Sequence, residues 1–570
     1  MYADFRVKIP NEKGKITKKT IKGTVYVYYQ LDRIYHPDKK YSEPKCTPIG
    51  KVCEDDMSMM IPNNKYLVYF PETVLPETKT SSTRSACLRI GAYLIIRKII
   101  AEYHLDEILK DIMGDENALF LDLAAYSIIT ENNAGQYYPD YAYNHPLLTN
   151  EMKIYSDSKV SKFINSLDKA QSVEFLNRWS ERISKKTEIY ISYDSTNKNC
   201  QAGDVELAEF GNAKDDASKP VINYSIGYDS QNSVPLWYEA YPGSIVDISQ
   251  LRYTINKVKG LGYKKIGFIL DRGYFCKENI HEMDRSEYDF IIMVKGMKSL
   301  VRELVLDVKG TFEEDRKCSI REYKVSGTTV KRKLFESDDK ERYFHVYYNE
   351  SKRISEREHL ESKIDQLAEL LERKQGEIGY ECPRPICHYF EPIYYTKTNL
   401  KTFVSAMERN DVINKEIQLC GYFVLITSSK MTASEALEQY KSRDASEKLF
   451  RGDKSYLGNH SYRVHSSESV TNKIFIEFVA LIIRNQIYTL LKDQMKKNKK
   501  KDNYMTVPAA LRELEKIEMT RQSDGNYRLE RAVTKTQKEI LKAFNLTEKN
   551  ICEQAININK ELQEIKTKRS

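Results

Sequence analysis

The run KKIGFILD at residues 264–271 decides the fold. Residues 266–270 carry no polar side chain, so a strand formed by them has no face for water and must be covered on both sides, as in an α/β sheet. Asp271 follows directly and would lie at the carboxyl end of that strand, where α/β sheets bind ligands. The run therefore predicts a central strand with an acidic residue at its functional edge.

Three strands and a helix are expected before this run. TEIYISYD (187–194), PVINYSIGYD (220–229) and SVPLWYEAY (233–241) are rich in β-branched and aromatic residues. PGSIVDISQLRYTINKVKGLGY (242–263) has the pattern of a helix that stops near a glycine. The first strand would end in Asp194, so two aspartates are predicted at strand ends.

A third acidic residue lies in TASEALEQYKSRDASEKLFRGDK (432–454). Thr432 and Glu435 form a capping box, and neither Gly nor Pro interrupts the sequence before Gly452, which predicts one helix. Tyr440, Arg443 and Glu447 would then share one stripe, with Lys454 seven residues further on. The alternative for this stripe is a solvated, salt-bridged helix face.

Two aspartates and a helical glutamate can build a site for two metal ions. Mg²⁺ and Mn²⁺ prefer oxygen ligands, and two ions about 3.5 to 4 Å apart can assist both sides of a phosphodiester displacement. The candidate ligands are Asp194, Asp271 and Glu447, although each alone could be a solubilising residue at the end of an element. Glu477 in the apolar run IFIEFVALIIR is a rival third acid, and Lys473 and Arg484 could pair with it.

These residues resemble the DDE transposases of bacterial insertion sequences, in the insertion sequence 4 superfamily with its Tyr-x2-Arg-x3-Glu-x6-Lys signature. Tyr440, Arg443, Glu447 and Lys454 match that signature, and DRGYF (271–275) is similar to the motif of the second aspartate. The resemblance implies an RNase H-like core interrupted by a β-rich insertion. It also implies that Asp194, Asp271 and Glu447 are catalytic and hold two Mg²⁺ or Mn²⁺ ions, while Tyr440, Arg443 and Lys454 bind DNA.

The implied reaction is cut-and-paste transposition, in which hydrolysis frees a 3′ hydroxyl at the transposon end and that hydroxyl attacks target DNA. The implied partners are double-stranded DNA, as terminal inverted repeats and target, and a second copy of the chain in the synaptic complex. The implied location is the bacterial cytoplasm, at the nucleoid. The alternatives are an RNase H-like nuclease without strand transfer and an inactive, domesticated DNA-binding relative.

One departure concerns base stacking. In related enzymes a tryptophan of the insertion can stack on a flipped base, whereas Trp179 and Trp237, the two tryptophans here, lie outside that region. The tyrosines that could replace it are Tyr343, Tyr347, Tyr348, Tyr394 and Tyr395, for which burial in strands is the alternative.

The chain is predicted to be a multidomain α/β protein with six segments. They are an N-terminal β-rich module (1–78), a helical DNA-binding domain (79–186), the core in two parts (187–275 and 431–495), the insertion (276–430), and a basic linker with a helical C-terminal region (496–570). Leu360, Ile364, Leu367 and Leu371 form a stripe on an insertion helix, typical of a helical hairpin or of a contact within the core. Arg84, Arg89, Arg97, Lys98 and the run 496–501 could face DNA or solvent.

Composition permits nucleic acid as a partner without requiring it. Lys plus Arg number 90 against 82 Asp plus Glu, a net charge of +8. The ten cysteines lack CxxC spacing, which favours free thiols in a reducing compartment, and Cys382, Cys387 and His388 fit a proline-rich turn better than zinc. No signal core and no run approaching about 18 apolar residues is seen, so no membrane contact is expected.

Overall fold

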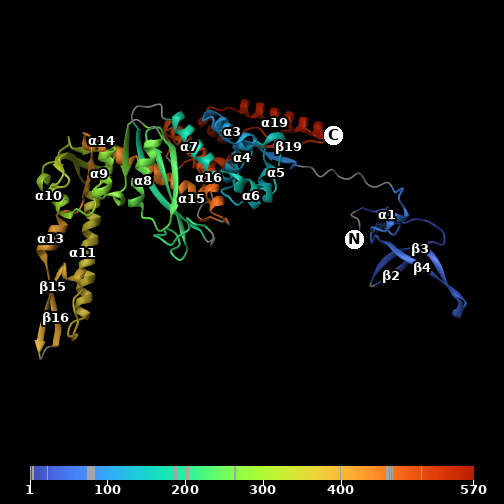
Figure 1. Cartoon of the computed structure of the whole chain (residues 1–570), viewed down its shortest axis with the longest axis horizontal. Helices are drawn as coiled ribbons and strands as arrows, with labels where there is room; N and C mark the ends of the chain where they lie inside the picture. The colour runs from blue at the N-terminus through green and yellow to red at the C-terminus, as the bar shows by residue number, and fades with distance from the viewer. Residues whose placement is uncertain are drawn as a thin grey trace. The chain divides into compact units, whose positions relative to one another are not determined.

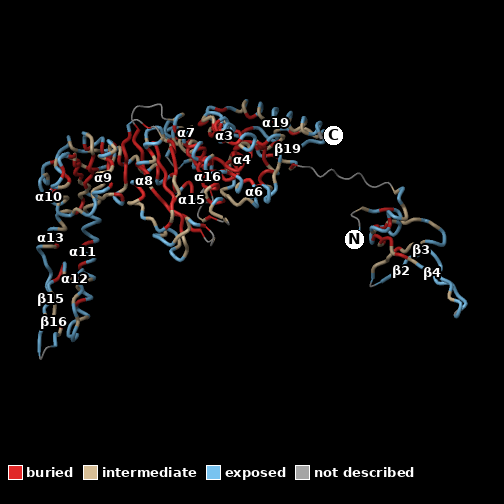
Figure 2. The backbone as a smooth tube through the Cα atoms, viewed as in Figure 1, coloured by how far each residue is buried: buried red, intermediate tan, exposed pale blue. Residues whose placement is uncertain are grey.

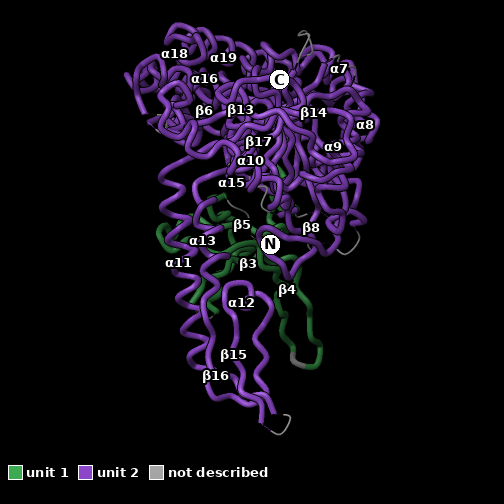
Figure 3. Tube along the Cα trace, turned by 90° about the vertical axis from the view of Figure 1, so that its left-hand side faces the viewer, with its two compact units in different colours: residues 1–84 green, residues 85–570 purple. Residues whose placement is uncertain are grey.

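The computed structural model describes residues 2–569 apart from residues 3–4, 22, 74–83, 184–188, 201, 203–204, 262, 264, 398–399, 458–460, 463, 465 and 502–503. The chain divides into two compact units, Met1–Arg84 and Ser85–Ser570 (Figure 3). The predicted segment boundaries after residues 78 and 186 lie outside the described residues.

The first unit is an antiparallel sheet in the order β1-β5-β4-β3-β2. Its strands are β1 (Val7–Lys8), β2 (Ile16–Ile21), β3 (Thr24–His36), β4 (Tyr41–Val52) and β5 (Met59–Pro62). Buried Val27, Ile49, Met60 and Tyr66 give this sheet a core of its own. The run TVYVYYQL (24–31), rich in β-branched and aromatic residues, forms the first part of β3.

The second unit is built on a ten-stranded mixed sheet in the order β12-β13-β14-β17-β11-β10-β7-β8-β9, with β18 pairing with β7. The strands are β7 (Ile189–Cys200), β8 (Val221–Asp229), β9 (Val234–Pro242), β10 (Ile266–Leu270), β11 (Asp289–Met293), β12 (Ser319–Ile320), β13 (Val325–Lys333), β14 (Glu341–Tyr348), β17 (Tyr422–Thr427) and β18 (Ser461–Tyr462). β10 runs parallel to β7 and β11, whereas β7, β8 and β9 form an antiparallel meander. The chain is therefore a mixed α/β protein, as predicted.

The central position of β10 is confirmed. Every residue of β10 is buried, and the sheet beside α8 (Asp247–Gly260) is drawn in red in Figure 2. Phe268 and Leu270 belong to the large apolar cluster that includes residues of α8 and α9 (Lys277–Arg285), while Ile269 belongs to the cluster under α14 (Ala433–Lys441). Helices thus cover both faces of this strand, which explains why it carries no polar side chain.

Part of the chain between β14 and β17 leaves the sheet as an arm (Figures 1 and 3). The arm consists of α11 (Glu350–Arg373), α12 (Arg384–Cys387) and the hairpin of β15 (Phe390–Lys397) and β16 (Leu400–Glu408). Leu360, Ile364 and Leu371 pack against Phe390 and Phe403 in the arm's own apolar cluster. The leucine stripe of α11 is therefore an intramolecular core contact.

Helices fill the remainder of the second unit. They are α2 (Gly91–Glu102), α3 (Leu105–Met113), α4 (Asn117–Thr130), α5 (Tyr138–Asn144), α6 (Asp157–Ser166), α7 (Lys169–Ile183), α10 (Lys298–Val308), α13 (Asn410–Ile417), α15 (Asp444–Tyr456), α16 (Ser467–Lys497), α17 (Val507–Leu514), α18 (Lys535–Ala543) and α19 (Glu548–Arg569). A short hairpin of β19 (Glu518–Arg521) and β20 (Tyr527–Leu529) pairs with β6 (Cys87–Arg89). This hairpin was not predicted, because strands of three and four residues are too short to show a period.

Helix α16 corrects one expectation from the sequence. Its length and composition would suffice to cross a membrane, although no such run was predicted. Within the protein, 78% of its most apolar window is buried, and it packs against α4, α6, α7 and β9. Its apolar residues therefore belong to the core.

We predict that Gly227→Ala destabilises the protein by about 1 to 3 kcal/mol, because an added methyl group would lie 2.3 Å from Cε2 of buried Trp237 on the neighbouring strand. Gly260→Ala is the matched control, since no atom outside its own helix backbone and its chain neighbours lies within 4 Å of the added group. Urea unfolding of both variants measures the difference. Equal stability of the two variants would contradict the packing described for β8 and β9.

Candidate active site

The first two candidate acids lie side by side because of strand register. β7 and β10 are parallel, and Tyr193 pairs with Leu270, the last residue of β10. The next residue on each strand is an aspartate, Asp194 and Asp271, so the pairing sets the two carboxylates at the same level. Asp194 does not end its strand, as the sequence suggested, because β7 continues to Cys200 through its pairing with β8.

The helix that carries the third acid is broken. The Thr432 and Glu435 capping box is confirmed, but α14 ends at Lys441 and α15 begins at Asp444. At the junction the backbone forms hydrogen bonds between residues three apart, as in a 3-10 helix. The Arg443 amide donates to the Tyr440 carbonyl (3.3 Å), and the Ser446 amide donates to the Arg443 carbonyl (2.9 Å). The prediction of one continuous helix was therefore wrong, because this tighter turn separates two helices.

Arg443 forms ion pairs with two of the three candidate acids. Its Nη1 lies 3.4 Å from Oδ1 of Asp271, and its Nη2 lies 2.9 Å from Oε1 of Glu447. Burial raises the pKa of Asp194 to about 6, against a hydrogen bond from the Ser195 amide and the charges of Lys214 and Arg443, which lower it. Arg443 thus pairs with Asp271, which follows β10, and with Glu447 on α15, and its charge also acts on Asp194 of β7.

Tyr440 supports this guanidinium from α14. The Cζ atom of Arg443 lies 5.5 Å from the centre of the Tyr440 ring, a distance typical of a cation–π contact. Burial raises the pKa of the Tyr440 hydroxyl to about 12, so the phenol stays protonated at neutral pH. Tyr440, Arg443 and Glu447 of the signature consequently lie together despite the helix break.

Lys454 is oriented by a loop that the sequence did not single out. Its Nζ lies 2.8 Å from Oδ2 of Asp215, in the connection between β7 and β8. The neighbouring Lys214 donates from Nζ to the carbonyl of Ser195 at 2.6 Å, next to Asp194. Both residues were missed because KDDASK is a mixed charge run, which in sequence looks like any solvated loop.

The donor chemistry of the site fits a divalent cation. Two of the three carboxylates pair with Arg443 and the third feels its charge, and carboxylate oxygens are the ligands that Mg²⁺ and Mn²⁺ prefer. In this structure the positive charge that faces the carboxylates is the Arg443 guanidinium. Among the described residues, no group of three or more His, Cys, Asp or Glu has the geometry to hold a metal. Cys382, Cys387 and His388 also form no such group, since His388 instead bonds Glu416 at 3.1 Å.

Glu477, the rival third acid, belongs to a different cluster. Its Oε2 lies 3.3 Å from Nζ of Lys198, a fully buried lysine that also pairs with Asp453 at 2.6 Å. Burial raises the pKa of Glu477, and nearby Asp453 raises it further, against the opposing effect of Lys198. The predicted partner Lys473 is linked through Asn133, which Lys473 contacts at 3.0 Å and which donates to Glu477 at 3.4 Å.

This buried cluster holds α15 in place. Lys198 lies on β7, Asp453 on α15 and Glu477 on α16, so one ammonium joins three elements. At the other end of α15, the hydroxyls of Ser446 and Ser192 lie 3.0 Å apart in the interior. Glu447 follows Ser446 directly, and its helix is therefore fixed to the strand that carries Asp194.

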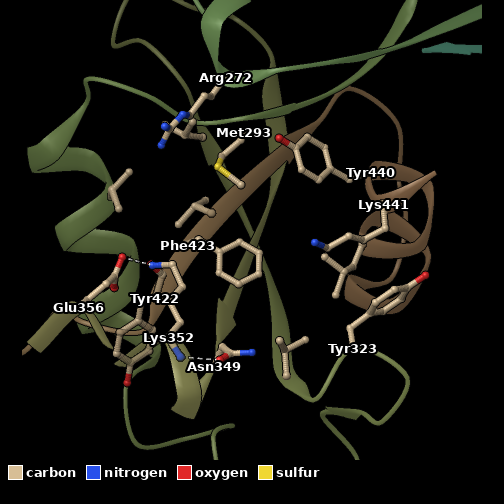
Figure 4. A pocket seen from close by; sticks show the side chains of 15 residues that line it. Arg272, Met293, Tyr323, Asn349, Lys352, Glu356, Tyr422, Phe423, Tyr440 and Lys441 are labelled. Carbon is tan, nitrogen blue, oxygen red and sulfur yellow. Dashed lines mark hydrogen bonds and ion pairs between the residues drawn. The ribbon is translucent and has the colours of Figure 1, made fainter. Parts of the chain in front are cut away.

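A cavity of about 600 Å³ opens beside the signature residues (Figure 4). Arg272 and Tyr440 lie at one end of it, and Lys352, Asn349 and Glu356 at the other. Its aromatic lining is Tyr323, Tyr422, Phe423 and Tyr440. The cavity thus combines apolar surfaces with positive charge.

The five tyrosines suggested for base stacking do not line this cavity. Tyr347 is buried, stacks on Phe423 and donates its hydroxyl to the carbonyl of Ala433. Tyr394 packs on Phe403 within the arm. Burial in the fold is therefore the role of these two side chains.

One comparison with known proteins identifies the family of this chain. Residues 191–483, just over half of the 570, match the family model described as "Transposase DDE domain". Among solved structures, the chain is similar to the piggyBac transposase in a cryo-EM synaptic complex with hairpin DNA, at 9% identity, 82% coverage of each chain and a TM-score of 0.34. No curated protein sequence matches the chain.

We predict that Lys198→Met lowers the free energy of unfolding by about 3 to 5 kcal/mol, because two buried carboxylates lose their shared cation. Lys219→Met is the control, since its pair with Asp216 is exposed and such pairs contribute about 1 kcal/mol at most. Urea denaturation of the two variants measures both values. A Lys198→Met protein within 1 kcal/mol of the control would show that the cluster does not hold α15.

Proposed function

The chain belongs to the family of DDE transposases, and from this premise we propose that it cleaves DNA at transposon ends and joins the freed 3′ hydroxyl to target DNA. The observation that supports the proposal is that Arg443 pairs with Asp271 and Glu447, while strand register brings Asp194 level with Asp271. We assign the chain to the branch with the Tyr-Arg-Glu-Lys signature, because Tyr440, Arg443 and Glu447 lie together and Lys454 lies on the same helix as Glu447.

The strand order supports an RNase H-like core. A meander of three antiparallel strands is followed by α8 and two strands parallel to the first, in the spatial order β9-β8-β7-β10-β11. The sequence between Asp271 and Glu447 then contributes β11 to β14 and β17 to the same sheet and projects the arm from it. We propose that the segment 276–430, which contains β12 to β16, corresponds to the family's insertion.

Asp194, Asp271 and Glu447 would hold two Mg²⁺ or Mn²⁺ ions. When bound, such a pair activates the attacking oxygen and stabilises the leaving oxygen of an in-line displacement. Arg443 then exchanges its two carboxylates for the phosphate of the DNA strand, to which its planar fork is suited. Its position over the Tyr440 ring keeps the guanidinium beside the acids during this exchange.

DNA is the partner that this chemistry requires. Tyr440, Arg443 and Lys454 would contact the strand at the cleavage site, and the cavity beside Tyr440 and Arg272 could receive an unpaired base next to it. A second copy of the chain would be needed to hold two transposon ends together. The expected place of action is the bacterial cytoplasm, where the DNA lies.

We predict that Glu447→Gln lowers the rate of nicking by about 10³-fold, since several kcal/mol of transition-state stabilisation depend on the ions it would hold. Glu477→Gln is the control, because the Lys198–Asp453 pair remains to anchor α15. A duplex carrying the transposon end, incubated with Mg²⁺ or Mn²⁺, measures nicking. Loss of nicking in Glu477→Gln alone would contradict the assignment of Glu447.

A second assay separates a transposase from a nuclease. Only a transposase transfers a precut 3′ end into target DNA.

We predict that Asp215→Asn strengthens binding of the transposon end about two- to fivefold, because a phosphate no longer competes with this carboxylate for Lys454. Asp216→Asn is the control, because it removes the same charge one residue away from a carboxylate that pairs with Lys219 rather than with Lys454. Fluorescence anisotropy without divalent ions compares the two variants. An equal effect of both would mean that only net charge matters.

A further inference from the structure

The first unit carries a β-ribbon that extends beyond its own core. The buried residues Val27 and Ile49 lie in the proximal halves of β3 and β4, whereas residues 31–35 and 41–45 are exposed. Tyr35 is 61% exposed, Ile34 50% and Tyr41 47%. A two-stranded ribbon with large side chains in water is marginally stable by itself, so this surface suits a partner.

The two faces of the ribbon differ in chemistry. Paired residues share a face, and the register pairs Arg33 with Pro44 and Tyr35 with Ser42. This first face, which we call the Arg33 face, carries a guanidinium, a phenol and a hydroxyl but no acidic residue. Among the described residues, the Arg33 side chain forms no ion pair.

The opposite face carries acidic as well as basic residues. It carries the pairs Asp32–Lys45, Ile34–Glu43 and His36–Tyr41. His36 bonds Glu43 at 3.2 Å and lies against the Tyr41 ring, with 5.5 Å between ring centres. Because Asp32 and Glu43 on the opposite face would repel a polyanion, the Arg33 face is the one that suits such a partner.

Positive charge is concentrated in this unit. Residues 1–84 contain 15 Lys and Arg against 10 Asp and Glu, a net of +5 out of the +8 of the whole chain. The edge strand β2 adds exposed Lys18 and Lys19, and the tip of the ribbon adds exposed Lys40. A surface of this charge attracts a polyanion.

We propose that the β3–β4 ribbon binds duplex DNA, with the Arg33 face in the major groove. That groove is about 12 Å wide and admits a two-stranded ribbon, whose strands lie about 4.8 Å apart. Arg33 and Ser42 can donate to base edges or phosphates, and Lys40 at the tip can reach the backbone. The choice of DNA among polyanions rests on the proposed function. The composition of the Arg33 face and the net positive charge of residues 1–84 do not depend on that function.

The test compares two double variants of the full-length protein. Arg33→Gln/Tyr35→Ser alters the Arg33 face, and Ile34→Ser/His36→Gln alters the opposite face of the same strand. Anisotropy of a labelled transposon-end duplex, without divalent ions, is expected to show at least tenfold weaker binding for the first variant and a change within about twofold for the second. In a plot of the logarithm of the binding constant against the logarithm of the salt concentration, the slope should become shallower by about 1 in the first variant alone.

Three results would overturn the proposal. They are duplex binding by the Arg33 face variant within twofold of wild type, an equal loss in the opposite-face variant, and a loss of binding to vesicles of phosphatidylserine and phosphatidylcholine with duplex binding unchanged. Circular dichroism and the unfolding midpoint check that both variants fold. Because no divalent ion is present, the result is independent of nicking, so failure of the active-site assignment would leave this test intact.

Discussion

The parallel register of β7 and β10 is the constraint on which the rest of the site depends. Because Tyr193 pairs with Leu270, the following aspartates of the two strands are brought level. A shift of one residue would turn one carboxylate to the other face of the sheet. The apolar residues of β10, packed under α14 on one face and against α8 and α9 on the other, fix that register.

The third acid is delivered by a helix that polar contacts attach to the same strand. Ser192 holds the start of α15 through Ser446, and Lys198 holds its end through Asp453, so β7 carries both anchors and Asp194 between them. Burying a lysine between two carboxylates costs desolvation energy that offsets their attraction. The main contribution of Lys198 is therefore to position α15 rather than to add net stability. With the backbone fixed in this way, Arg443 pairs with Asp271, which follows β10, and with Glu447 on α15.

Strong local patterns in the sequence predicted the central parts of this structure. The apolar run of β10, Asp271 after it and the Thr432 capping box each depend on a few adjacent residues, and each is found as expected. The extension of β7 beyond Asp194 and the break at Arg443 were missed because tertiary pairing and a tight turn decide them. Lys198 and Asp215 were missed for a similar reason: each gains its role from a partner more than 200 residues away in sequence.

The central claim is that Asp194, Asp271 and Glu447 form one cation site when DNA is bound. The most direct measurement is an anomalous difference map from a crystal of the protein with a transposon end and Mn²⁺. The account predicts manganese peaks within coordination distance of all three carboxylates, with Arg443 turned to a phosphate. Manganese bound elsewhere, or Arg443 still paired with Asp271 and Glu447 on bound DNA, would contradict it.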